Sequence, residues 1–217
     1  MNLRSQGDSW HVRHYEVMVV GWNFGCVVID FDFLKAVDEW LEPARRQFIM
    51  GDESPEEARS KALIDMGLAV FEALGLPAVA DDAPISMDDA TSRYFEGYAA
   101  GIHEGKTVLV GRRFGLAQDT EKFCAGYALI SARYGRVSAF WCNDASDSYM
   151  VSVFQDGTRI RFLSKGPDLH DDEGARLPDE IEPDAHGHDL LMVLLEKAAG
   201  CSFGELTELT MERFSPC

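Results

Sequence analysis

The residues best suited to bind a metal ion lie close together near the end of the chain. His186, His188 and Asp189 fall within four positions, and imidazole nitrogens with a carboxylate oxygen are ligands that a divalent transition metal accepts. Two histidines separated by one residue in a loop lack the fixed geometry of a pair one helical turn apart. We therefore expect them to be solvated near a helix N-terminus, and we keep a metal-dependent or small-ligand enzyme as an alternative function.

Other stretches resemble known functional motifs without their context. Residues 100–107, AGIHEGKT, resemble a phosphate-binding loop, but an expected helix precedes them and a strand follows them. Asn143, Asp144 and Asp147 do not match the calcium-loop pattern and favour turns instead. The sequence contains no G-x-S-x-G motif and no cysteine beside a histidine. We therefore expect no catalytic residue, no bound metal and no cofactor.

The clearest charge pattern lies in residues 168–189, where nine of 22 residues are acidic and Arg176 alone is basic. This composition predicts a loop. The carboxylates either pair with the two arginines just upstream or face a partner, where they would speed its capture. The residues predicted to take part are Asp168, Asp171, Asp172, Glu173, Asp179, Glu180, Glu182, Asp184, Arg159 and Arg161.

The arginines belong to a predicted three-stranded unit over residues 137–164. Asp156-Gly157 is a dipeptide typical of a two-residue type I′ turn. This turn would place Val151 opposite Phe162 and Val153 opposite Ile160 on a core face. Arg159, Arg161 and Phe154 would then share the outer face. Residues 137–142 supply the third strand.

The remaining elements predict an α+β domain, with a mostly antiparallel sheet and helices packed largely on one face. Two strands are expected within residues 11–30, as a hairpin near the sheet's edge, and another over 106–111. A capping box at Ser54 predicts a helix to Leu74. Further helices are expected over 33–48, 86–98, 119–135 and 190–199. The whole chain, 1–217, is treated as one domain with a possible N-terminal subregion, 1–80, and a C-terminal sheet-forming region, 100–217.

Bulk composition limits the classes of partner. Of 217 residues, 46% are hydrophobic, five are scattered cysteines, and the formal net charge is -17. The negative charge disfavours nucleic acids and anionic membranes and favours a basic protein. Neither an export signal at residues 1–16 nor a membrane-spanning apolar run is evident. We expect a soluble, cytoplasmic protein.

Several short features together resemble a known class of protein. Residues 137–141, Asp147-Ser148-Tyr149 and Asp156-Gly157 precede the acidic loop and a closing helix. With its acidity, the chain resembles a bacterial polymorphic-toxin immunity protein over about half its length. The resemblance implies an antidote that binds one cognate, basic toxin domain and blocks its active site or substrate entry without catalysis. An acidic adaptor or regulatory protein is a further alternative.

Overall fold

The computed structural model describes residues 23–33, 55–116, 121–167, 169–178, 180 and 187–217. Its strands are β1 (Asn23–Ile29), β2 (Ala78–Ala80), β3 (Ile85–Ser86), β4 (Tyr98–His103), β5 (Lys106–Val110), β6 (Val137–Asn143), β7 (Ser148–Gln155), β8 (Thr158–Gly166), β9 (Leu169–Gly174) and β10 (Thr210–Pro216). Its helices are α2 (Pro55–Ala73), α3 (Met87–Ala90), α4 (Arg113–Leu116), α5 (Glu121–Tyr134), α6 (Gly187–Ala199) and α7 (Phe203–Thr207), with one 3-10 turn, η1 (Asp144–Ser146).

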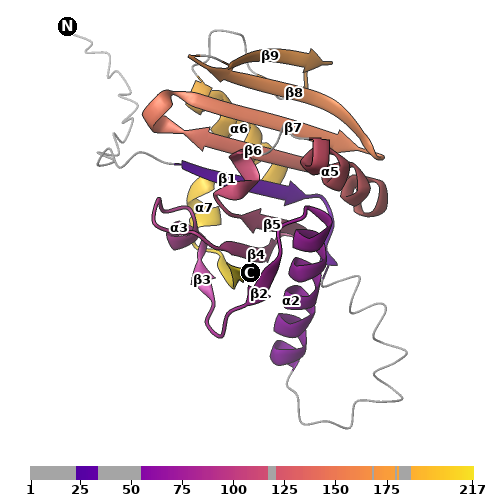
Figure 1. The fold of residues 1–217 in the computed structure, drawn as a ribbon, viewed down its shortest axis with the longest axis vertical. Helices are drawn as coiled ribbons and strands as arrows, with labels where there is room; N and C mark the ends of the chain where they lie inside the picture. The colour runs from indigo at the N-terminus through magenta and orange to yellow at the C-terminus, as the bar shows by residue number, and fades with distance from the viewer. Residues whose placement is uncertain (1–22, 34–54, 117–120, 168, 179, 181–186) are drawn as a thin grey trace, which may run out of the picture.

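The strands form one antiparallel sheet in the order β2, β10, β4, β5, β1, β6, β7, β8 and β9, with β3 also paired to β10 (Figure 1). The predicted α+β class is confirmed. β1 lies in the middle of this sheet, because Cys26 is paired with Val110 of β5 and with Phe140 of β6. The expectation that the N-terminal strands lie near an edge is therefore wrong for β1.

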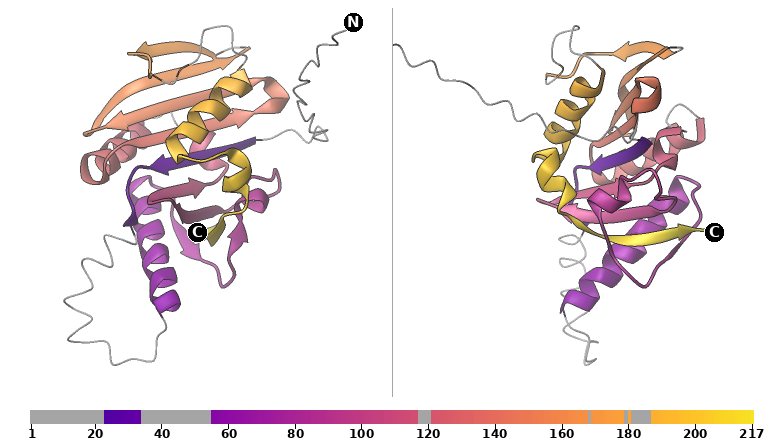
Figure 2. Two further views of the ribbon diagram at one scale, coloured as in Figure 1. Left: turned by 180° about the vertical axis from the view of Figure 1, so that it is seen from behind. Right: turned by 90° about the vertical axis from the view of Figure 1, so that its left-hand side faces the viewer.

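Helices cover both faces of the sheet, rather than largely one (Figure 2). On β1, Val27 packs in the core under α2 and α5, whereas Val28 packs in the core under α6 and α7. A strand buried on both faces reads as a continuous apolar run. The run GCVVI in β1 has this property, and all six residues from Phe24 to Ile29 are buried.

Several predicted helices are confirmed. α2 ends before Gly75, whose φ of 68° suits a glycine at a helix C-terminus, and α5 ends in the same way before Gly135, with φ of 103°. α6 covers the predicted helix over 190–199. Of the helix expected over 86–98, only Met87–Ala90 is helical, and Tyr98 already belongs to β4. The expected helix over 33–48 and the first N-terminal strand lie outside the described residues, apart from Phe33.

The C-terminal segment adds a strand that the sequence did not predict. Ser202 forms a capping box with Glu205 at the start of α7. The chain then enters β10, where Phe214 is paired with Ala80 of β2 and with Tyr98 of β4. The last residues of the chain thus join β2 to the rest of the sheet.

Candidate functional site

The β7–β8 hairpin contains the predicted turn and an unpredicted bulge. Asp156 and Gly157 have φ of 50° and 78°, and Gln155 lies opposite Thr158, as predicted. Beyond Phe154 and its partner Arg159 the register shifts, so that Val153 lies opposite Arg161. The predicted pairs of Val151 with Phe162 and Val153 with Ile160 are therefore wrong by one residue.

This bulge directs the two arginines to opposite faces of the sheet, although the prediction placed them together. Arg159 lies on the α5 face, where its guanidinium is 3.6 Å from Cys124 Sγ and 4.6 Å from the ring centre of Phe162. Arg161 lies beside Val153 on the α6 face. Its side chain is only 1% exposed.

Arg161 is held by a dense network of acceptors. Its Nε and Nη2 donate to the two carboxylate oxygens of Glu180, at 2.5 and 2.9 Å. Its Nη1 donates to Asp172 Oδ1 at 2.5 Å and to the carbonyl oxygen of Glu173 at 2.9 Å. Glu180 also accepts from the Leu177 amide at 3.2 Å. Such a two-oxygen pair is the geometry that makes a buried guanidinium tolerable.

These contacts shift the protonation equilibria of the partners. The hydrogen bond from Arg161 holds the pKa of Asp172 below its ordinary value of 3.8. The reciprocal hydrogen bond to Glu180 raises the pKa of Arg161. Both shifts favour the charged forms of Arg161 and Asp172, and the contacts join Glu180 and Asp172 to β8 through Arg161.

Part of the predicted acidic loop is the edge strand β9. Asp171 accepts a hydrogen bond from Ser164 Oγ at 2.7 Å, and Glu173 forms an ion pair with Arg159 at 2.9 Å. With Asp172 and Glu180 on Arg161, pairing within the chain is observed for these carboxylates. Four of the predicted residues lie outside the described part of the chain: Asp168, Asp179, Glu182 and Asp184. A role of the whole set in binding a partner stays a prediction.

The predicted metal ligands are not brought together in the described structure. His186 lies outside the described residues, and Asp189 is an exposed residue in the first turn of α6. His188 belongs to the same turn, but its side chain is not described. Within the described part of the chain, no group of three histidine, cysteine or acidic side chains is arranged to hold a metal.

The other candidate motifs have structural explanations. Residues 100–107 span the β4–β5 hairpin, whose turn residues Glu104 and Gly105 have φ of 46° and 77°, so a strand rather than a helix precedes the turn. Asn143 Oδ1 accepts from the Ala145 amide at 3.2 Å, as expected for a turn. Burial raises the pKa of Cys26 to about 12, which leaves its thiol protonated.

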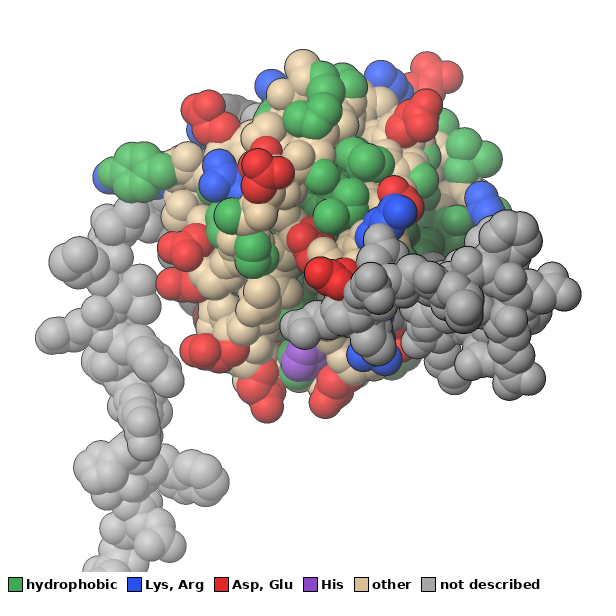
Figure 3. Space-filling view, turned by 90° about the horizontal axis from the view of Figure 1, so that it is seen from below, with side chains coloured by type: hydrophobic (Ala, Val, Ile, Leu, Met, Phe, Trp, Pro, Cys, Tyr) green, Lys and Arg blue, Asp and Glu red, His purple; other side chains and the backbone are tan. Residues whose placement is uncertain are grey.

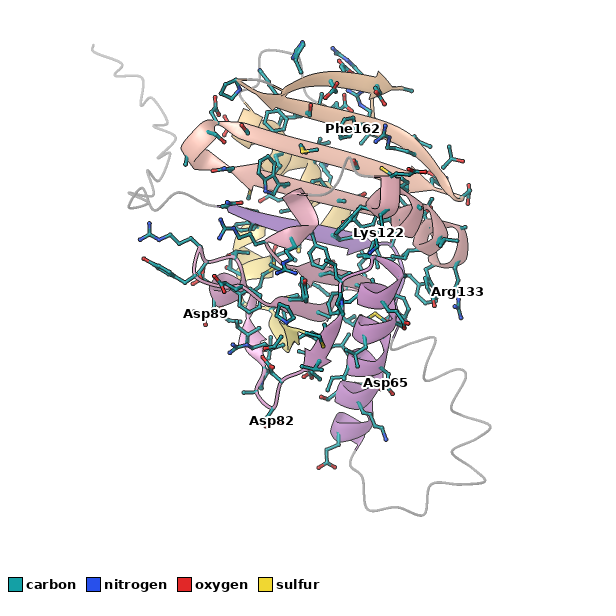
Figure 4. All side chains as sticks on the ribbon, in the orientation of Figure 1. Asp65, Asp82, Asp89, Lys122, Arg133 and Phe162 are labelled. Carbon is teal, nitrogen blue, oxygen red and sulfur yellow. The ribbon has the colours of Figure 1, made fainter. Side chains whose placement is uncertain are left out.

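An acidic surface that the sequence analysis missed lies where α3 meets α7. We define the α3–α7 patch as five exposed acidic residues: Asp88 and Asp89 of α3, Glu205 of α7, Glu208 just after α7, and Asp82 from the loop before β3. The two segments meet because the Met87 amide donates to the Leu209 carbonyl at 2.9 Å. Figure 3 shows acidic side chains along this margin of the molecule, and Figure 4 labels two of them, Asp82 and Asp89. The four aspartates within residues 81–89 are the feature of the sequence that indicates an acidic surface here.

A large aromatic ring is exposed just beyond α3. Tyr94 is 75% exposed, the highest value among the exposed large hydrophobic side chains of the described residues. The guanidinium of Arg93 stacks 4.6 Å from the centre of this ring. Exposed tyrosines with a polar surround are common anchors of protein interfaces.

An apolar groove of about 470 Å³ lies between α2 and α5. Met66 and Val70 of α2 and Leu129 and Ile130 of α5 line it, and Leu129 is 68% exposed. Figure 4 labels two charged residues at its rim, Asp65 and Arg133. The described chain stops at Phe33, which also lines the groove, and resumes at α2. We assign no ligand to this groove.

Comparison with known proteins found no matching family model, no matching curated protein and no matching solved structure. Among the described helices, none has the length and apolar character needed to cross a membrane. The geometry of the described residues is therefore the basis for assigning a function.

Proposed function

We propose that the chain is a cytoplasmic immunity protein that binds and neutralises a basic toxin domain without catalysis. The observation that carries the proposal is the α3–α7 patch together with the exposed ring of Tyr94, which follows α3 by four residues. An aromatic anchor within a charged surround is what a protein interface needs, because the ring supplies contact area while the carboxylates attract the partner. The free state of all five cysteines agrees with a reducing compartment.

The α3–α7 patch is a better candidate than the β9 carboxylates. Asp172, Glu173 and Glu180 already neutralise Arg159 and Arg161. Residues 81–96 and 202–213, by contrast, contain eight acidic residues and two arginines, and Arg213 pairs with Asp81 at 2.8 Å. The five carboxylates of the α3–α7 patch form no ion pair among the described residues, so their charge stays available for long-range attraction of a basic partner.

A growth-rescue experiment tests the function. A toxin domain taken from a gene adjacent to that of this chain is expressed in a bacterial host with and without the chain. Rescue of growth, together with a stable complex of the two purified proteins, supports an immunity role. Unrelieved toxicity or failure of the two purified proteins to associate contradicts it.

A charge-matched comparison tests the surface. The variant Asp82→Asn/Asp88→Asn/Glu208→Gln removes three charges from the α3–α7 patch, and Asp65→Asn/Glu72→Gln/Glu121→Gln removes three exposed charges from α2 and α5. The patch variant should slow association with the toxin domain about tenfold at low salt. The control should change it far less. Equal effects of the two variants would place the interface elsewhere.

A further inference from the structure

A small pocket lies between α6 and the sheet, and its inner wall is apolar. Its volume is about 100 Å³. The wall is formed by Val28, Phe140, Val151, Val153 and Leu194, all of them buried. Because a cavity of roughly 150 Å³ accommodates benzene, this pocket has room for a short aliphatic group.

The mouth of the pocket is basic, although the whole chain has a net charge of -17. Lys106 of β5, Arg136 before β6 and Lys197 of α6 line it, with Asp30 as the one acidic lining residue. Lys106 is already engaged, because its Nζ donates to the Ala198 carbonyl at 2.6 Å and lies 4.0 Å from Asp30. This contact also neutralises the negative end of the α6 dipole, which would otherwise repel an anion.

Three polar groups at the pocket remain available to a ligand. In the described part of the chain, Arg136 and Lys197 form no ion pair, and the hydroxyl of Ser138 has no hydrogen-bond partner. Ser138 is 4% exposed, and its strand neighbours Val28 and Val153 both belong to the α6-side core. Its hydroxyl therefore lies in the pocket, where it can donate a hydrogen bond to a bound acceptor.

We propose that this pocket binds a small aliphatic monocarboxylate. Its carboxylate accepts hydrogen bonds from Arg136, Lys197 and Ser138, and its short chain packs against the apolar wall. A guanidinium matches the two oxygens of a carboxylate. Inorganic phosphate fits less well, because the inner wall offers no donors for its remaining oxygens.

Titration of the full chain with sodium butyrate tests the site. We expect saturable binding by calorimetry, and amide chemical-shift changes centred on Ser138, Val153 and Leu194. Butyramide has nearly the same shape without the charge, so it should bind about tenfold more weakly or less. Inorganic phosphate should not displace butyrate. Equal affinity for butyramide, or displacement by phosphate, would overturn the carboxylate assignment.

Matched variants separate the pocket from nonspecific binding. Arg136→Met and Lys197→Met should each raise the Kd for butyrate about tenfold. Arg133→Met removes an exposed arginine of α5 that does not line the pocket, and it should leave the Kd unchanged. Circular dichroism and thermal unfolding confirm that each variant is folded. Absence of saturable binding to the wild-type chain at millimolar butyrate, or equal Kd values for all variants, would refute the site.

Discussion

Arg161 is the residue whose environment departs furthest from what its type would suggest. An arginine with a side chain that is 1% exposed needs several acceptors, and Glu180, Asp172 and the Glu173 carbonyl supply them. Because the Glu180 side chain is itself only 5% exposed, water cannot replace the hydrogen bonds of either partner in that pair. Removing one partner of this pair therefore leaves the other buried without its counter-charge, which is costly.

Replacing Arg161 by leucine should lower the free energy of unfolding by about 3 to 5 kcal/mol, because Glu180 is left buried and charged without its partner. The double variant Arg161→Leu/Glu180→Leu should recover most of that loss. Arg159→Ala, which breaks the more exposed pair with Glu173, should cost only about 1 kcal/mol. Urea unfolding measures all three. A double variant no more stable than Arg161→Leu would show that the pair is not the source of the effect.

The pKa of Asp172 predicts how stability changes in acid. Its folded-state pKa is lowered by Arg161 from 3.8, so the folded protein binds this proton more weakly than the unfolded chain. The resulting stabilisation is present above the unfolded pKa and is lost as the pH falls through the lower, folded value. Unfolding free energy measured below pH 5 should therefore fall less steeply in Asp172→Asn than in wild type. Parallel curves would contradict this assignment.

At the scale of elements, β9 shows how an acidic segment becomes a strand. Its residues LHDDEG have no apolar alternation, yet Asp171 pairs with Ser164 and Glu173 with Arg159. A strand at the sheet's edge that carries charges resists pairing with other chains, so its acidity also protects the edge. β9 ends at Gly174, which lies opposite Arg161 with φ of 85°.

Gly174→Ala should disrupt this end of the strand. A Cβ atom there would lie 2.2 Å from the backbone oxygen of Ile160, and an alanine disfavours the positive φ. We expect a loss of about 2 kcal/mol or more in unfolding free energy, with faster amide exchange in β8 and β9. The control is Gly204→Ala, where a Cβ meets nothing within 4 Å and helix propensity favours alanine. Similar stability of the two variants would contradict the clash.

Turns and helices that are specified by a short stretch of sequence were predicted correctly. The helix expected up to Leu74, the Asp156-Gly157 turn and the helix expected over 119–135 are observed as α2, the β7–β8 turn and α5, whereas Ser54 itself lies outside the described residues. The bulge at Ile160 has no such signal, because it depends on how Arg161 meets Glu180 from a separate segment. β9 and β10 were missed for the same reason, since an acidic edge strand and the irregular burial of TMERFSP show no alternation.

The candidate sites were less predictable than the fold. Pairing of the acidic segment with Arg159 and Arg161 was anticipated, although not their separation onto opposite faces. The α3–α7 patch requires two segments more than a hundred residues apart to meet, as Met87 and Leu209 do. The pocket at Ser138 likewise combines residues from β1, β5, β6, β7 and α6. Charge and spacing along the sequence do not specify which distant segments come into contact in the fold.

For the whole molecule, the central position of β1 makes the fold strongly non-local. β1 is paired with β5 and β6, so a strand near the start of the chain joins two halves of the sheet that are made much later. β10 in turn connects β2 and β4 from the C-terminal end. Closing such long connections before the contacts form is entropically costly, so we expect slow folding compared with helical proteins of this length.

Added salt should stabilise the chain and weaken its association with a basic partner. A net charge of -17 makes the folded state repel itself, and raising the salt from 0.01 to 0.1 M shortens the screening length from about 30 to about 10 Å. The buried Arg161–Glu180 pair is screened less than these surface charges. Calorimetric Tm should therefore rise over this range, while the rate of partner association falls. The variant Asp82→Asn/Asp88→Asn/Glu208→Gln should show smaller changes in both. A Tm that falls with salt would mean that attractive pairs, rather than net repulsion, dominate the folded state.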